Sequence, residues 1–470
     1  MSNITWRFGQ NRDLQGAEVV LTDESQAKFL VAVIGAGPAG LYAAKQLTSE
    51  GVRVVLLNRD VKPGGLAEYG IYPDKHKMKE GLRNQFRMIL ASPLIDYYGN
   101  VQVGKTADIS LDELLALGFQ ALLVTVGAQG TKWLGIPGEE LSGVYHAKDI
   151  VYHYNQLPPF SESQFHVGNR VAVVGAGNVM LDIAHWLIQE KKVTEVTAVV
   201  RRGPAEVKFT RTELEYVAKN LDYAAYETEL ERVRPVMEAV GQDASKPREV
   251  IQAAIRRALD TGSNTRFRLE FLESPVRLHG DGAGHVSGFE VEDNFLELVN
   301  GEVKARGLGV TRVLDVDTVI FAIGDRVDDR FGLPTQGNEF GKHPQPRFPV
   351  EGLSYELYDV QNSRPLPGFF VAGWSRQAST GLVGVARKDG TNGAKAVLQY
   401  LADQPPANFD ALDALRRKLA ALPKPVVTRA DMLRLEAVEK QLAGQAGLEE
   451  FKFSTNQEML AAIQMAVAEK

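Results

Sequence analysis

Two stretches of the chain share one pattern of apolar and polar positions. In residues 28–60, an apolar run is followed by a glycine turn, a stretch of helical period and a second apolar run. Residues 169–203 repeat this order. Apolar runs separated in this way are typical of two parallel strands joined by a helix. The pattern predicts an α/β protein with two Rossmann-like dinucleotide-binding domains in tandem.

Two further apolar runs end in glycine, at residues 121–128 and 318–325. Each is predicted to be a buried strand, and each stands where the chain would cross between the two domains. Proline and polar residues over 155–169 indicate a linker, and the Gly/Pro-rich stretch 333–352 indicates a long loop. Beyond Pro405 the pattern becomes helical and charged.

The composition excludes several classes of chemistry. Among 470 residues there is no cysteine, which removes disulfides, dithiol active sites and cysteine-ligated clusters from this chain. The formal net charge of −6 disfavours a general nucleic-acid binder. No apolar stretch reaches the roughly 20 residues that cross a bilayer, and the acidic N-terminus is unlike a signal or transit peptide. We expect a cytoplasmic protein that binds neither membranes nor nucleic acids.

The first glycine turn has the spacing G-x-G-x-x-G at Gly35, Gly37 and Gly40. The first glycine permits the tight turn, the second lets backbone N–H groups approach a pyrophosphate, and the third permits close helix–strand packing. An acid that binds ribose hydroxyls is expected at the end of the second strand, but Asn58 stands there. Asparagine can bond a hydroxyl without the strength that a charge adds. A weaker grip on the ribose is therefore expected.

The second glycine turn departs from this spacing. Gly175 and Gly177 are followed by Met180, which demands space at a crowded contact between helix and strand. The second strand ends in Arg201 and Arg202 instead of an acid. Paired guanidinium groups suit the 2′-phosphate of NADP, although two arginines here could also be a solvated surface pair. An NADP site is favoured over an NAD site.

Other candidate motifs carry less weight. Residues 99–106 match the phosphate loop of ATPases, but their alternating interior is typical of a strand, and the next helix is expected only near residue 110. The eight histidines form no clustered ligand set, so no metal site is expected. Residues 370–383 predict a strand, a turn that contains Trp374, and the start of a helix. A helix N-terminus facing a flat ring system can stabilise developing negative charge, although an ordinary strand–turn–helix has the same pattern.

Several segments together resemble the adrenodoxin reductase family of ferredoxin–NADP reductases, flavoproteins of the glutathione-reductase-like group. The resemblance runs from about residue 28 to the end of the chain, and several of its segments are specific to the family. The segments are VAVIGAGPAG, PGGLAEYGIYPD (63–74), YYGNVQVGK (97–105), IPGEELSGVYHAKDIVYHYNQLP (136–158), VAVVGAGNVMLDIA (171–184), VVRRGPAEVKFTRTEL (199–214), FLESPV (271–276), AIG (322–324), FVAGWSRQASTGLV (370–383) and FKFSTNQEML.

The resemblance implies FAD in the first domain and NADP in the second, with the NADP domain inserted into a discontinuous FAD domain. The implied parts are a lead segment (1–27), the first part of the FAD-binding domain (28–128), the NADP-binding domain (129–327), and the second FAD-binding part with a C-terminal helical extension (328–470). The positions carried over for FAD are Gly35, Gly37, Pro38, Ala39, Gly40, Asn58, Gly65, Leu66, Val103, Gly127, Gly373, Trp374, Gly381, Leu382 and Val383. Those for NADP are Gly175, Ala176, Gly177, Asn178, Val179, Arg201, Arg202, Glu213 and Gly381.

The residues implied to lie nearest the chemistry include one departure from the family. In the family's P-D-H sequence a histidine follows the aspartate, and it is thought to share a hydrogen-bond network with the glutamate matched by Glu213. Here Lys75 takes that place and His76 comes next. Either the lysine replaces the imidazole or the loop is shifted by one residue. The candidate catalytic residues are Glu213, Lys75, His76 and Trp374.

The implied activity is that of an NADPH-dependent flavoprotein reductase that passes electrons through the flavin to a ferredoxin-like iron–sulfur protein. The lack of cysteine supports this choice, because disulfide reductases of the same fold need two thiols beside the flavin. Two alternatives stay open: reduction of a small molecule such as a quinone, and nucleotide binding without turnover. Candidate residues for a basic docking face are Lys246, Arg248, Arg256 and Arg257, for which solvated helix charge is the more ordinary explanation.

Overall fold

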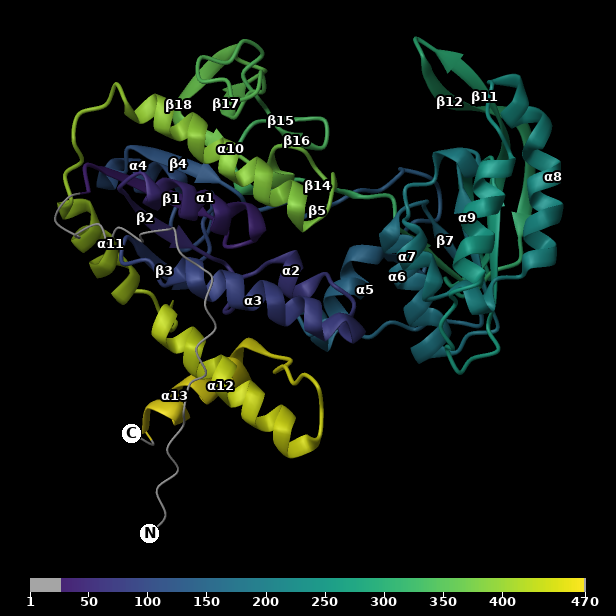
Figure 1. The fold of residues 1–470 in the computed structure, drawn as a ribbon, viewed down its shortest axis with the longest axis horizontal. Helices are drawn as coiled ribbons and strands as arrows, with labels where there is room; N and C mark the ends of the chain where they lie inside the picture. The colour runs from purple at the N-terminus through teal and green to yellow at the C-terminus, as the bar shows by residue number, and fades with distance from the viewer. Residues whose placement is uncertain (1–26, 469–470) are drawn as a thin grey trace, which may run out of the picture.

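The computed structural model describes residues 27–468, and its largest sheet has seven strands (Figure 1). The strand order is β17-β18-β4-β1-β2-β3-β19, so the sheet takes strands from both ends of the chain. β1 pairs in parallel with β2 on one side and β4 on the other. The strands are β1 (Phe29–Ile34), β2 (Val52–Leu57), β3 (Ile95–Gly99), β4 (Ala121–Val124), β17 (Glu356–Asp359), β18 (Arg364–Val371) and β19 (Val427–Thr428).

Helices cover both faces of this sheet, and a buried apolar cluster lies on each face. α1 begins directly after Gly37 with a proline in its first turn, where the missing N–H has no helical partner to lose. We call residues 27–124 and 356–468 the first unit. Its helices are α1 (Pro38–Ser49), α2 (Leu66–Tyr69), η2 (Pro73–Lys75), α3 (His76–Leu90), α4 (Leu111–Leu117), η8 (Gly373–Ser375), α10 (Val383–Leu401), α11 (Asp410–Ala420), α12 (Arg429–Ala446) and α13 (Asn456–Ala468).

Residues 144–321 form the second unit, whose central sheet has five parallel strands in the order β6-β13-β7-β8-β9. A separate antiparallel sheet has the order β10-β11-β12, and its β11–β12 hairpin projects from the unit (Figure 1). The strands are β6 (Val144–His146), β7 (Arg170–Val174), β8 (Glu195–Val200), β9 (Arg266–Phe271), β10 (Glu273–Gly280), β11 (Val286–Val299), β12 (Glu302–Leu314) and β13 (Thr318–Phe321). The helices and turns are α5 (Ala147–Tyr154), η3 (Phe160–Glu162), α6 (Asn178–Trp186), η4 (Leu187–Lys191), η5 (Pro204–Glu206), α7 (Arg211–Glu215), η6 (Ala218–Asn220), α8 (Tyr223–Ala239) and α9 (Ser245–Ile255).

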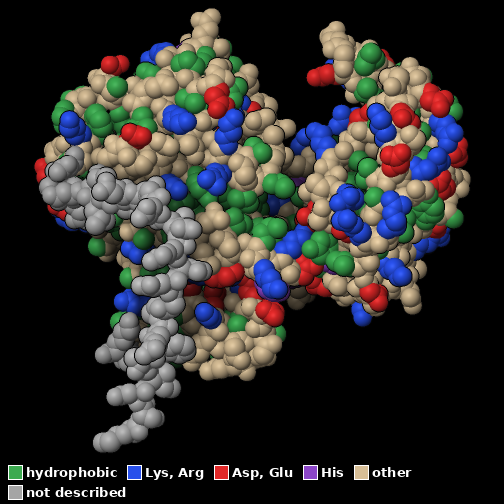
Figure 2. Space-filling view, viewed as in Figure 1, with side chains coloured by type: hydrophobic (Ala, Val, Ile, Leu, Met, Phe, Trp, Pro, Cys, Tyr) green, Lys and Arg blue, Asp and Glu red, His purple; other side chains and the backbone are tan. Residues whose placement is uncertain are grey.

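The chain crosses between the units twice, directly after the apolar runs that end in glycine. The crossing segments contain β5 (Gly130–Thr131) and β14 (Asp325–Arg326), which pair with each other in antiparallel fashion. This arrangement agrees with the expected fold class, two Rossmann-like domains with the second inserted into a discontinuous first. Figure 2 shows the two lobes, with the surface hollowed between them near the tip of the β11–β12 hairpin.

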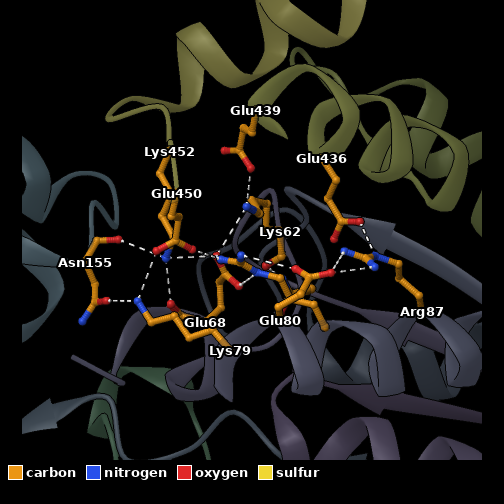
Figure 3. Close-up of polar contacts among 12 residues, drawn as sticks. Lys62, Glu68, Lys79, Glu80, Arg87, Asn155, Glu436, Glu439, Glu450 and Lys452 are labelled. Carbon is orange, nitrogen blue, oxygen red and sulfur yellow. Dashed lines mark hydrogen bonds and ion pairs between the residues drawn. The ribbon is translucent and has the colours of Figure 1, made fainter. Parts of the chain in front are cut away.

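The C-terminal segment, residues 427–468, returns to the first unit. β19 adds to the edge of the sheet beside β3, and buried charges hold the helices that follow (Figure 3). Lys62 Nζ donates to Glu439 at 2.5 Å, and Lys452 Nζ lies 3.0 Å from Glu68 Oε1. Lys452 also lies 3.5 Å from the backbone carbonyl of Asn155 in the second unit. Buried charges that are paired in this way become costly when one partner is removed, so the segment is firmly attached.

Several local expectations can be compared with the fold. The match to a phosphate loop at 99–106 is not followed by a helix, because α4 begins only at Leu111. The long loop at 333–352 carries the short strands β15 (Thr335–Gln336) and β16 (Glu339–Phe340) and is preceded by the turn η7 (Asp329–Phe331). The lead segment 1–27 lies outside the described residues, apart from residue 27. Over residues 27–468, no helix combines the length and the apolar character that a membrane span requires.

Candidate functional site

The first glycine turn joins β1 to α1. Gly35 has φ of +105°, and a Cβ added there would lie 2.7 Å from the carbonyl oxygen of Thr125, so only glycine fits without strain. A Cβ on Gly40 would lie 1.9 Å from Gly35 O, which shows how closely α1 packs on its own turn. Nothing lies within 4 Å of a Cβ on Gly37. The space beside Gly37, at the start of α1, is therefore open, as an anion site at a helix N-terminus requires.

Residues from distant parts of the chain surround this turn. Gly65 packs on Gly37, where a Cβ would lie 3.2 Å from the Gly37 Cα. Gly373 packs on Ala39, where its Cβ would lie 2.6 Å from the alanine Cβ. Gly127 N donates to Ser375 Oγ at 2.9 Å, which joins the end of β4 to η8. The fold thus brings these carried-over FAD positions together around the start of α1.

Asn58 is buried at the end of β2, and backbone groups occupy its side chain. Its Oδ1 accepts from the N–H of Ala36 at 3.1 Å, and its Nδ2 donates to the carbonyls of Asp60 at 2.8 Å and Lys62 at 3.0 Å. The amide thus connects the glycine turn to the 60–62 loop. This framework role has a direct basis in the hydrogen bonds, whereas a contact to ribose stays a prediction.

The remaining positions carried over for FAD lie farther along the chain. Trp374, in η8, is half-buried, and its indole Nε1 donates to the carbonyl of Thr380 at 3.0 Å. Leu382 is 68% exposed just before α10 begins at Val383. Two positions are packed inward: Val103 is buried and bridges to Ile109, and Leu66, at the start of α2, is half-buried.

The second glycine turn joins β7 to α6. Gly175 has φ of +149°, and a Cβ there would lie 2.4 Å from the carbonyl oxygen of Ala322. Gly177 faces open space as Gly37 does. Met180 is fully buried within the apolar cluster of the second unit, so its side chain occupies core space and the helix tolerates it. Asn178 Oδ1 accepts from the N–H of Thr210 at 2.8 Å, which closes one side of the turn.

Arg201 and Arg202 follow β8 at the surface, Arg201 exposed and Arg202 half-buried. Their backbone is held in place: Asn294 Nδ2 donates to Arg201 O at 2.9 Å, and Leu272 N donates to Arg202 O at 3.3 Å. No ion pair is found for either guanidinium group within residues 27–468, whereas most other arginines there have an acidic partner. The two cationic groups are therefore available to a bound anion.

The candidate residues of the P-D-K-H stretch diverge in the fold. Lys75, at the end of η2 in the first unit, forms an ion pair with Glu213 of α7 in the second unit. His76 instead lies 3.5 Å from Glu449 of the C-terminal segment. It is therefore Lys75, and not His76, that contacts the glutamate matched to the family's network. Of the candidate catalytic residues, Lys75 and Glu213 come together, while His76 contacts the C-terminal segment instead.

Comparisons with known proteins agree with this geometry. Residues 29–222 match the family model described as pyridine nucleotide-disulphide oxidoreductase. The mitochondrial NADPH:adrenodoxin oxidoreductase of Arabidopsis thaliana is 30% identical over 392 residues, which cover 75% of this chain and 78% of that relative. The chain belongs to the adrenodoxin reductase family.

Other members extend the comparison over nearly the whole chain. The NADPH-ferredoxin reductase FprA of Mycobacterium leprae is 29% identical, with 92% of this chain and 97% of that relative covered. A solved structure of FprA from Mycobacterium tuberculosis, described as revealing a covalent modification of NADP⁺, superposes with a TM-score of 0.77 at 25% identity. It covers 93% of this chain and 99% of its own. The family likeness thus includes both units and the C-terminal segment.

Three side chains at these sites were not among the family positions carried over. Asp182, on α6, lies 3.6 Å from Lys75 Nζ. Asp389, on α10, accepts from the N–H of Gly373 at 2.6 Å and pairs with Arg376, so it holds the start of η8. Asn294, on β11, fixes the backbone at Arg201. Asp182 lies in the NVMLDIA segment and could have been marked as a charge on an apolar helix, whereas the other two depend on long-range contacts.

Proposed function

We propose that this protein is an FAD-containing NADPH oxidoreductase that passes electrons from NADPH through the flavin to a ferredoxin-like iron–sulfur protein. The observation that carries the proposal is the pair of glycine turns, each with open space at its middle glycine. The second turn is also followed by two guanidinium groups that have no ion pair within residues 27–468. Membership of the adrenodoxin reductase family supports it. The predicted division into 28–128, 129–327 and 328–470 is part of the proposal.

The first turn fits the pyrophosphate of FAD. A Cβ on Gly37 would enter the open space at the start of α1, and Gly65 and Gly373 bring further backbone close to that point. We assign Trp374 and residues 381–383 to the flavin ring, because the start of α10 brings partial positive charge there. When bound, FAD accepts a hydride and releases electrons singly. The chain itself needs only to bind, orient and shield that group.

The second turn fits NADPH. The start of α6 faces open space at Gly177 and suits the pyrophosphate, and Arg201 and Arg202 suit the 2′-phosphate. At the junction, burial works against the charge of Lys75, but Asp182 and Glu213 outweigh it and raise the pKa of the ammonium group. Lys75 is therefore a fixed positive charge near neutral pH and not a proton donor.

The electrons must leave the protein, because the chain has no cysteine to accept them. An acidic iron–sulfur protein would dock on basic side chains, and the basic candidates on α9 and directly after it differ in their availability. Arg248 is paired with Glu227 and Glu231, whereas Arg256 and Arg257 are exposed. Exposed paired charge adds little to docking, so Arg256 and Arg257, which have no ion pair in the part of the chain that the structure describes, are the better candidates. We propose a cytoplasmic location.

The test is to mix the protein with NADPH under anaerobic conditions and record its absorbance. Bleaching of a flavin band, followed by recovery when an oxidised ferredoxin is added, is the expected result. Ferredoxin reduction that slows with added salt supports protein docking, because steering between charged partners is screened. Reduction of a quinone at a rate that does not depend on salt, with no reduction of ferredoxin, would favour the small-molecule alternative. A colourless protein that FAD does not reconstitute would overturn the proposal.

A further inference from the structure

One ammonium group bridges two carboxylates at the junction between the units. Lys75 comes from η2 of the first unit, Asp182 from α6 and Glu213 from α7 of the second. Lys75 Nζ pairs with Glu213 and lies 3.6 Å from Asp182 Oδ1, and its side chain is only 11% exposed. The ring of Tyr216 covers the ammonium group at 5.0 Å. Two attachment points on different helices fix the direction of the lysine as well as its distance.

The surroundings of Asp182 make its charge conditional on pH. Burial raises the pKa of Asp182 to about 7, although Lys75 opposes the shift. With one ammonium group between two carboxylates, the cluster carries surplus negative charge, which a proton on Asp182 removes. The titratable groups that face Asp182 or share its cluster are Asp74 and Lys75 on η2, Tyr72 before it, Tyr154 on α5, His185 on α6, Glu190 on η4, Glu213 on α7, and Tyr216 directly after α7.

We propose that Asp182 is a positioning residue: in its charged form it joins Glu213 in holding Lys75, and so sets the angle at which the second unit meets the first. This inference rests on the proposed function, in which the two units must present NADPH and flavin to each other. Hydride transfer needs the reacting atoms about 3–3.5 Å apart, and a misplacement of about 1 Å can slow it by 10²-fold. Once Asp182 is protonated, Lys75 keeps a single charged partner, Glu213, and the direction of the lysine across the junction is less tightly fixed.

The contribution of Asp182 to folding stability should fall as the pH rises, whereas its hold on Lys75 should strengthen. A carboxyl group whose pKa is raised on folding favours the folded state at low pH, and this contribution is lost as the pH rises through its folded pKa. Asp182→Asn removes a buried charge, so its thermal midpoint at pH 8 should be no lower than that of the wild type. A merely structural ion pair would give the reverse, with a lower midpoint in the variant.

The kinetic test uses the flavin-loaded protein in anaerobic stopped flow. For the wild type, the limiting rate of flavin reduction by NADPH should fall about five- to tenfold between pH 8 and pH 6. Asp182→Asn should show the low rate at both values, with the half-saturating NADPH concentration changed less than about twofold because Arg201 and Arg202 are untouched. Glu190→Gln is the matched control: it removes a carboxylate that binds Tyr72 at the same junction and should keep the wild-type pH profile. A wild-type rate and profile in Asp182→Asn would overturn the proposal.

A second readout is independent of turnover. Because the chain has no cysteine, Gln399→Cys on α10 and Glu249→Cys on α9 give two unique labelling sites, both exposed. Spin-label distances between the units should be narrowly distributed at pH 8, and broader at pH 6 or in Asp182→Asn. Unchanged distributions would exclude a positioning role. If NADPH never reduced the flavin but the distances behaved as expected, only the proposed function would fail.

Discussion

The two glycine turns of this protein begin alike and then differ at their third position. In both, the first glycine has positive φ and sits against a carbonyl at the end of a neighbouring strand. In the first turn, Gly40 lets α1 touch its own turn, whereas in the second, Met180 is buried in the core. The comparison shows that the turn itself needs the first two glycines, while the third position depends on how closely the helix must approach.

The two turns also differ at the end of the second strand. Asn58 is buried and uses its amide within the chain, while Arg201 and Arg202 are left without acidic partners among the described residues. The first unit therefore shapes its nucleotide site with backbone and internal hydrogen bonds, whereas the second offers charge. We expect the first unit to recognise FAD mainly by shape, and the second unit to recognise NADPH by the charge of its 2′-phosphate.

The largest expected effect separates folding from binding in the first turn. Gly40→Ala places a Cβ 1.9 Å from a backbone oxygen, which cannot move aside as a side chain can. We expect a destabilisation of more than about 3 kcal/mol and a protein without flavin. Gly37→Ala is the matched control, because its Cβ enters open space. The urea midpoint of the apoprotein should be the same as that of the wild type, and only FAD binding should be lost. Similar unfolding of both variants would contradict the comparison.

At the same position in the second turn, a substitution should also lower stability, but by leaving a cavity and not by a steric clash. Met180→Ala leaves a cavity in the buried cluster of the second unit, and we expect a loss of about 2–5 kcal/mol in urea unfolding. NADPH affinity should change less than about threefold, because the glycines and arginines stay. Met88→Ala, at a 70% exposed methionine, should change stability by less than about 0.5 kcal/mol. A large loss of affinity without a loss of stability would place Met180 at the coenzyme.

The turns were predictable from sequence because their signals are local. Glycine spacing, apolar runs and the arginine pair lie within one strand–helix–strand unit, and the fold confirms those elements. The surroundings were not predictable: Gly390 packs on Ala39, and Asn294 holds Arg201, through contacts between residues far apart in sequence. Asn58 shows a further limit. Its place in the pattern predicted a contact with a ribose. Only the path of residues 60–62 shows that its amide N–H groups already donate to backbone carbonyls of the chain.

Removing the positive charge of Arg201 and Arg202 should cause a smaller loss, which is confined to the binding of NADPH. Arg201→Ala with Arg202→Ala should weaken NADPH binding at least about 100-fold, or about 2.7 kcal/mol, since a single hydrogen bond to a charged group already contributes about 1.5–3 kcal/mol. NADH binding, which involves no 2′-phosphate, should change less than about threefold. The exposed pair Arg256 and Arg257, changed to alanine, controls for net charge. Equal losses for both coenzymes would remove the 2′-phosphate assignment.

The smallest expected effect decides what Asn58 does. Asn58→Asp replaces the Nδ2 donor with an oxygen that faces the carbonyls of Asp60 and Lys62, so these acceptors lose their partner and meet negative charge. We expect the apoprotein to lose about 1–3 kcal/mol in urea unfolding, with no gain in FAD affinity. If the residue instead gripped the ribose, a carboxylate would strengthen that bond and FAD would bind more tightly. Measuring the unfolding midpoint without FAD and the dissociation constant with it separates the two roles, because only the framework role acts on the protein before the cofactor arrives.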